Sequence, residues 1–257
     1  MKARLPSPRM SRTSGQAAVE TAITMPLTIF MVLGTLQLFM LLQARLFAEH
    51  AAYSAVRVGA VRHGECKAMT HAAILALLPS FTSYLGEATP GNSPEQKLAN
   101  AFALRTVGKI DDNRYNRGDD GRHNRPVVWI FRPSPRLGSI RRDAEDDFDD
   151  PDLPSYRLEV KVVYWYPLRI PFANWVMATM YRAWFGFGDY THQNPLLPTQ
   201  QANWTQQSRA LDAFRTEFMT RFNDEQWVFP VSGSASMRMM TPPRRALFRR
   251  QNCSPAP

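Results

Sequence analysis

Residues 21–42 read TAITMPLTIFMVLGTLQLFMLL, and this stretch decides the fold class because it contains no charged residue. An α-helix rises ~1.5 Å per residue, so the run is long enough to cross a hydrocarbon core of ~30 Å. A cleavable secretory signal would have an apolar region of only ~7–15 residues that ends in a small-residue cleavage site. This run instead continues at helical spacing through residues 43–62, so we interpret it as a retained membrane anchor.

The charges that flank the run predict its orientation. Four basic residues and no acidic residue precede Gly15, and they are Lys2, Arg4, Arg9 and Arg12. Positive charge next to a membrane span favours the cytoplasmic side. We therefore expect a single-pass protein of the bacterial inner membrane, with a cytoplasmic N-terminus and a periplasmic C-terminal domain.

A second pattern lies directly before the run. A basic leader ends in Gly15, followed by Gln16, and Glu20 comes just before the apolar segment. This layout is typical of a prepilin-type leader, which a peptidase cuts after the glycine on the cytoplasmic side. A carboxylate at the edge of hydrocarbon is costly, so it usually has a partner or a function. The alternative interpretation is that Glu20 only reaches the cytoplasmic interface and that Gly15 has no role.

The stretch GQAAVETAITMP (residues 15–26) resembles the TadE/TadG-like minor pseudopilins of the tight-adherence (Flp) pilus system. In that family small residues and a Val-Glu pair precede an apolar helix with a proline six residues after the glutamate, as Glu20 and Pro26 do here. An aromatic residue often follows the family's glutamate, whereas this chain has Thr21. The passage PLRIPF at residues 167–172 is similar to a corresponding passage of TadE-like proteins.

The resemblance implies a minor pseudopilin-like subunit that helps to assemble or modulate a tight-adherence pilus or a related secretion apparatus. It also implies that Glu20 guides assembly by pairing with the amine of a neighbouring subunit. The implied partners are the inner membrane, other pilin or pseudopilin subunits, the pilus assembly machinery and a prepilin peptidase. Two other classes stay open: an uncleaved single-pass protein with a periplasmic ligand- or partner-binding domain, and a membrane-anchored periplasmic enzyme.

Small residues recur beyond the membrane segment at steps of three and four, which places them on one face of a helix. They are Ala44, Ala48, Ala51, Ala52, Ala55 and Gly59. A stripe of small residues allows another helix to approach closely. The stripe is therefore either a packing seam for neighbouring pilin-like helices or a surface that packs against the chain's own following domain.

The rest of the chain predicts an α+β exported domain with a small antiparallel sheet and flanking helices. Strand patterns occur at 126–132, 157–166 and 231–241, and the second alternates apolar and charged residues as far as Val162. Helices are expected at 71–85, with an interruption near Pro79, and from Ser93 to about Val107. Two more are expected in the segment that residues 167–172 open and that runs through Trp184, and at 203–222. The division is a leader at 1–15, a long helix at 16–62, an extracytoplasmic domain at 63–241 and a flexible basic tail at 242–257.

No motif predicts catalysis, a metal site or a cofactor. The acidic cluster between Asp143 and Asp150 lacks the EF-hand pattern and is interpreted as a solvated loop. The two cysteines, Cys66 and Cys253, either form one disulfide outside the cytoplasm or remain unpaired thiols. The positive charges cluster near the two ends of the chain, so we expect no nucleic-acid partner. Because no motif predicts catalysis, we also expect that the protein is not an enzyme.

Overall fold

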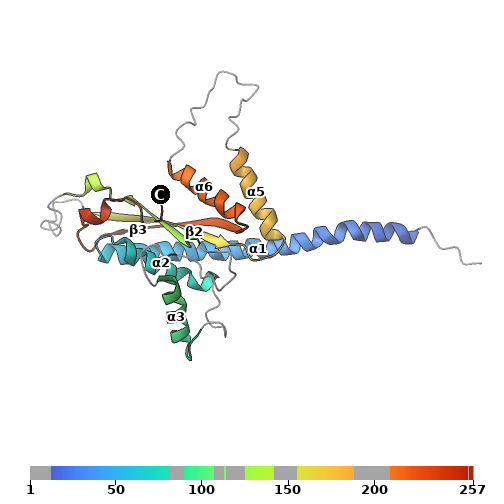
Figure 1. The fold of residues 1–257 in the computed structure, drawn as a ribbon, viewed down its shortest axis with the longest axis horizontal. Coiled ribbons are helices and arrows are strands. Elements are labelled where there is room, and N and C mark those ends of the chain that lie inside the picture. The colour runs from blue at the N-terminus through green and yellow to red at the C-terminus, as the bar shows by residue number, and fades with distance from the viewer. Residues whose placement is uncertain are drawn as a thin grey trace, which may run out of the picture.

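The computed structural model describes residues 13–81, 90–106, 113, 125–141, 155–187, 209–253 and 255–256. Its elements are α1 (Thr13–Val61), α2 (Cys66–Phe81), α3 (Pro94–Thr106), β1 (Val128–Ser134), η2 (Leu137–Ser139), β2 (Arg157–Pro167), α5 (Ala173–Phe187), α6 (Arg209–Asn223), β3 (Val228–Arg238) and η3 (Arg245–Phe248). A long apolar helix thus leads into helices around a three-stranded antiparallel sheet, and the predicted α+β class is confirmed. Figure 1 shows α1 as a rod that extends far beyond one end of the domain.

The sheet has β2 at its centre, with β1 and β3 antiparallel on either side. Val162 in β2 lies opposite Ile130 of β1 and opposite Gly233 of β3. The three strands lie close to the predicted ranges. Antiparallel pairing on both sides means that each strand presents alternate side chains to opposite faces of the sheet.

The two faces of β2 explain why its sequence alternates only in the first half. Leu158, Val160 and Val162 are buried in the main core with α1 and α2, and the charged residues between them are exposed. From Val163 onward the second face is buried as well, because α6 covers it. There the Trp165 ring stacks on Phe214 with 5.0 Å between centroids. The alternation in β2 therefore ends at the point where α6 begins to cover its second face.

The C-terminal half of α1 lies directly on β3. A Cβ atom added to Gly233 would come within 2.4 Å of the carbonyl oxygen of Ala48 in α1. A helix backbone can approach a strand so closely only where both side chains are minimal. Ala48 and Gly233 therefore set the distance between the anchor helix and the sheet.

The helices after α1 differ in detail from the prediction. Pro79 does not interrupt the second helix, because α2 continues through it to Phe81. A proline inside a helix removes its own amide bond and crowds the carbonyl four residues earlier. The burial of Leu77, Leu78 and Phe81 on either side of Pro79 stabilises the helix across this defect. The predicted start of α3 is confirmed, since the Ser93 hydroxyl accepts a bond from the Gln96 amide at 3.3 Å and the Gln96 side chain accepts one from the Asn92 amide at 3.0 Å.

The segment after β3 is packed rather than flexible, which corrects the expectation of a loose basic tail at 242–257 for its described residues. Phe248 in η3 is only 1% exposed, and a Cβ atom on Gly64 would lie 2.4 Å from its ring. His63 in the turn after α1 donates its amide to the Thr241 hydroxyl at 3.0 Å. Arg244, Arg249 and Arg250 are exposed, whereas Arg245 is partly buried and donates to the Ile140 carbonyl. The apolar residues and the backbone bonds hold the rest of the segment in place.

Candidate functional site

The predicted processing and assembly residues lie at the start of α1. The bond between Gly15 and Gln16 lies in the first turn of the helix, which begins at Thr13. Glu20 is four residues beyond Gln16, so the two positions share a helix face and are separated by ~6 Å along the axis. The helix therefore places residue 16, whose amine a cut after Gly15 would expose, one turn below the Glu20 carboxylate.

Glu20 is exposed at the edge of a purely apolar surface. The Thr24 hydroxyl donates to the Glu20 carbonyl oxygen at 2.8 Å, so this threonine satisfies its polar group within the helix. Thr28 and Thr35 do the same, with 2.8 Å to the carbonyl oxygens of Met25 and Val32 respectively. The side chains of these threonines add no free donor to the helix surface, and α1 continues through Pro26 without a break.

No residue of α1 between positions 18 and 36 is buried. This bare segment exposes large apolar side chains, among them Ile23, Met31 and Leu36 at 69%, 62% and 52%. Within the described chain α1 is the one helix long and apolar enough to cross a membrane. An uncovered apolar helix of this length needs lipid or other protein around it.

The bare segment ends at a polar junction with the folded domain. Gln37 is 0% exposed, and its side-chain oxygen accepts a hydrogen bond from the Ile170 amide at 3.0 Å. About two turns earlier on α1, the Phe30 ring meets Phe172 edge-on with 5.6 Å between centroids. This hydrogen bond joins the loop between β2 and α5 to α1.

The stripe of small residues packs within the chain. Ala44 is 1% exposed, and Ala48, Ala51 and Ala55 are 0% exposed in the main core. Gly59 is buried too, and an added Cβ atom there would lie 2.5 Å from the sulfur of Met69 in α2. Of the two interpretations of this stripe, the structure therefore favours packing against the chain's own domain. A neighbouring helix has no access to it.

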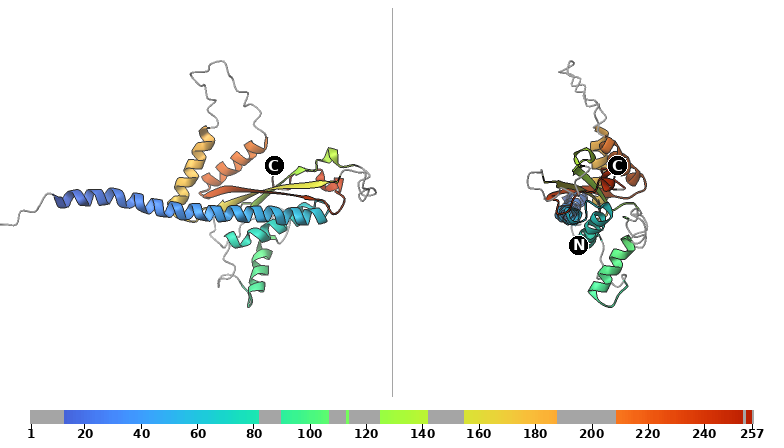
Figure 2. Two further views of the ribbon diagram at one scale, coloured as in Figure 1. Left: turned by 180° about the vertical axis from the view of Figure 1, so that it is seen from behind. Right: turned by 90° about the vertical axis from the view of Figure 1, so that its left-hand side faces the viewer.

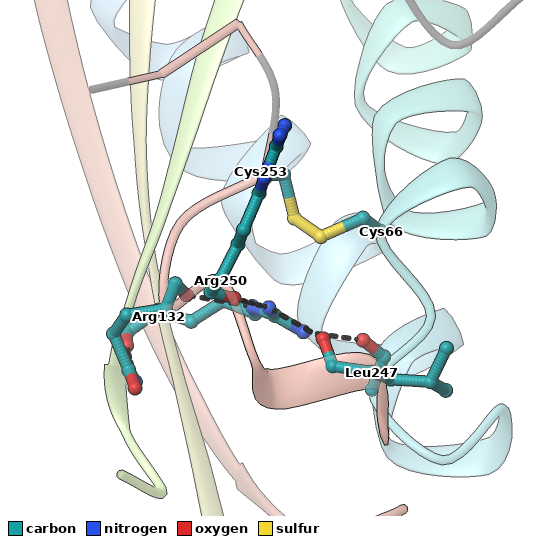
Figure 3. Close-up of a disulfide and its surroundings, with 7 residues drawn as sticks. Cys66, Arg132, Leu247, Arg250 and Cys253 are labelled. Atoms are coloured by element: carbon teal, nitrogen blue, oxygen red, sulfur yellow. Dashed lines mark hydrogen bonds between the residues drawn. A yellow bond between two sulfur atoms is a disulfide. The ribbon is translucent and has the colours of Figure 1, made fainter. Parts of the chain in front are cut away.

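A disulfide joins Cys66 at the start of α2 to Cys253 near the C-terminus, with 5.3 Å between the Cα atoms (Figure 3). Next to it the buried guanidinium of Arg132 in β1 donates to backbone carbonyls of the C-terminal segment. The distances are 2.9 Å to Gln251, 2.9 Å to Leu247 and 2.5 Å to Arg250. A further bond of 2.7 Å reaches the Gly64 carbonyl. Burial lowers the pKa of Arg132 to about 10, which leaves it charged at neutral pH.

Sequence reasoning missed three residues of this arrangement: Gln37, Arg132 and Gly233. Gln37 is the one amide side chain in the uncharged run at 21–42, which was a usable signal. Gly233 lies in a run of small residues, VSGSAS, that indicates a close approach only once its partner is known. Arg132 gave no signal, because its partners are carbonyls far away in the sequence.

Other kinds of functional site, such as a metal site, find little support among the described residues. No group of three or more His, Cys, Asp or Glu side chains among them is arranged to hold a metal ion. The acidic cluster at 143–150 lies outside the described residues. The aromatic side chains of α5 have two kinds of environment, since Tyr181 packs on Phe218 with 5.0 Å between centroids while Trp175 is 51% exposed.

Comparison with known proteins identifies the N-terminal part of the chain. Neither the curated proteins nor the solved structures gave a significant match. The family model described as TadE-like protein matches residues 15–57, which include Gly15, Glu20, the whole bare segment and most of the small-residue stripe. Proteins of this pilin-type family are generally not enzymes. The chain therefore carries a TadE-like domain at residues 15–57, built on α1.

Proposed function

We propose that this protein is a pilin-type subunit, anchored in the inner membrane by α1, that contributes to the assembly of a tight-adherence pilus. The observation that carries the proposal is the coincidence of the TadE-like match with one continuous helix. That helix has Glu20 at one end, a bare apolar segment in the middle and a folded domain on its far half. A role in assembly needs no catalytic site on this chain.

The proposed cycle begins with leader processing on the cytoplasmic side. A prepilin peptidase cuts after Gly15 and removes four basic residues, which lowers the net charge from +9 to +5 (9 − 4). The amine of Gln16 then lies one helical turn from Glu20. A carboxylate near hydrocarbon gains much from an opposite charge, so Glu20 pairs with the amine of an adjacent subunit and sets the register between the two helices.

The packing of α1 supports a specific location for the contact between subunits. The small-residue stripe from Ala44 to Gly59 is already covered by the chain's own domain. Neighbouring helices therefore meet on the bare segment, where Gly34 has no atom within 4 Å of an added Cβ. The assembly interface is thus the TadE-like half that lies within the membrane.

Intact-mass analysis of the full-length protein extracted from membranes that contain an active prepilin peptidase tests the first step. The proposal expects a mature chain that begins at Gln16, and it expects Gly15→Leu to abolish processing. Gly34→Leu is the matched control, since it adds the same side chain to the same helix at an open position. A wild-type chain that keeps residues 1–15 would refute processing and would favour an uncleaved anchor with a periplasmic binding domain.

Co-purification of differently tagged copies tests the role of Glu20. Glu20→Gln removes the charge with little change in size, and we expect it to lower subunit association and pilus assembly while membrane insertion is retained. Glu49→Gln is the control, because Glu49 is an exposed acid of the same helix that pairs with Arg45 at 3.3 Å. Equal effects of the two substitutions would contradict a specific function of Glu20.

A further inference from the structure

The surface of α5 carries an exposed stripe of uncharged side chains. Three of them are strongly exposed: Phe172, directly before the helix, at 56%, Trp175 at 51% and Met180 at 68%. They recur at helical spacing with partly or fully exposed neighbours on the same face. We call the α5 stripe the set Phe172, Trp175, Val176, Thr179, Met180 and Ala183.

The opposite face of α5 packs on the domain. Ala173 and Ala178 are buried at 0% and 1%. The Tyr181 ring lies 5.0 Å from Phe218 of α6 and 4.8 Å from Phe229 of β3. Because α6 and the sheet take up this side, the α5 stripe points away from the domain core.

Figures 1 and 2 show where α5 lies relative to α1. In both views α5 leaves α1 at a steep angle and is the last element of the domain before the bare segment. The contact between Phe172 and Phe30 joins the stripe to the surface of that segment. Phe172 has a φ of 69°, a conformation that costs free energy for a bulky residue and persists only where the surroundings enforce it.

We propose that the α5 stripe lies in the outer interface of the bilayer that α1 crosses, with lipid covering it. A helix roughly parallel to the membrane plane, with Trp and Phe on an uncharged face, suits the boundary between head groups and acyl chains. The inference rests on the anchoring of α1 in the proposed function, but not on a role in pili.

The proposal also places the membrane boundary on α1. The bare segment from 18 to 36 is roughly 28 Å long, close to the ~30 Å of a hydrocarbon core. Backbone amides near hydrocarbon must be satisfied within the protein, and Gln37 does this for Ile170 at the junction. The cover of the folded domain therefore begins near Gln37 on one side of α1, whereas Leu38, Phe39 and Leu42 are 53%, 60% and 65% exposed and continue the apolar surface to the Leu42 expected from hydropathy.

Lipid is a better occupant of the stripe than a second copy or a soluble partner. The stripe is continuous through Phe30 with the bare surface of α1, which in the proposed topology lies in lipid before the subunits assemble. The residues of the stripe include no charge and only one hydroxyl, Thr179. A protein partner would have to displace lipid to reach it and would find few polar groups to recognise.

Three methionines allow a matched labelling experiment on the full-length chain. Met31 on the bare segment, Met180 in the stripe and Met240 after β3 are 62%, 68% and 65% exposed. Each is replaced singly by cysteine and labelled with bimane; the native cysteines are paired and stay unlabelled without reductant. The labelled proteins are reconstituted in phosphatidylethanolamine/phosphatidylglycerol vesicles with brominated acyl chains, which quench a fluorophore that touches them.

The expected result is strong quenching at position 31, at least about half of that loss at position 180, and little at position 240. Met240 is bonded to Ala60 at the far end of α1, roughly 36 Å beyond residue 36 along the helix. Quenching at 31 but not at 180 would overturn the inference and leave the anchor intact. An absence of quenching at 31 would overturn the anchor itself. Loss of quenching at position 180 but not at position 31 as the protein-to-lipid ratio rises would show that a second copy displaces lipid from the stripe, which would overturn lipid as its occupant.

Discussion

Removal of the disulfide should destabilise the exported domain by a large fraction of its total stability. Cys66 and Cys253 are separated by 187 positions in the chain, so their bond closes a loop that contains nearly the whole domain. The loop-entropy relation gives about 5 kcal/mol for a loop of this length, and native disulfides contribute about 2–5 kcal/mol in practice. Since domains are stable by about 5–15 kcal/mol, the folded state should survive with a clearly lower unfolding midpoint.

The assay is urea unfolding of the full-length protein in detergent, followed by the fluorescence of buried tryptophans such as Trp129 and Trp165. The double variant Cys66→Ala/Cys253→Ala should unfold at lower urea than the oxidised wild type. Dithiothreitol should lower the wild type to the level of the double variant. Because the chain has two cysteines in all, reductant should not affect the double variant.

Two results would refute this reasoning. Equal midpoints for the oxidised wild type and the double variant would have two possible meanings. Either residual structure already restrains the ends of this loop in the unfolded state, or the disulfide does not form. A response of the double variant to reductant would mean that the effect does not come from this disulfide.

Other consequences follow from the packing and burial of single residues. Gly233→Ala places a methyl group against the backbone of α1, so we expect a loss of about 1–3 kcal/mol in urea unfolding, whereas Gly138→Ala, with no atom within 4 Å, should be neutral. Arg132→Met leaves several buried carbonyls without a donor and should cost about 2–5 kcal/mol and speed reduction of the disulfide, whereas the exposed Arg249→Met should do neither. Burial raises the pKa of Tyr181 from 10.0 to about 12, so the folded state favours the neutral phenol. The linked stability is complete below pH 10 and is lost as the pH rises to about 12, a loss that Tyr181→Phe should remove in unfolding curves measured across this range.

The elements with strong local periodicity could be predicted from the sequence. Residues 21–42 predicted a helix because charge is absent, and β2 was predicted because its first half alternates between core and solvent. The start of α3 was predicted because the capping groups at Ser93 and Gln96 are local. In each case the pattern that decides the structure lies within a few neighbouring residues.

The parts that depend on distant partners could not be predicted. The tail looked flexible because it is basic, yet Phe248 and Cys253 find partners in the turn and helix that follow α1. Hydropathy could not show where the folded domain begins to cover α1, because Leu38, Phe39 and Leu42 stay 53%, 60% and 65% exposed beside the buried Gln37. Only the position of Gln37 in the fold shows where the cover changes.

The continuity of α1 has a mechanical consequence. One helix of 49 residues, about 74 Å long, carries both the candidate membrane span and the long helix on which the folded domain packs. A flexible tether between them would absorb part of any movement, since such a chain changes its end-to-end distance at little cost. A rigid rod delivers the whole displacement. A push or pull on the N-terminal end of α1 therefore moves the folded domain by the same distance and in the same direction.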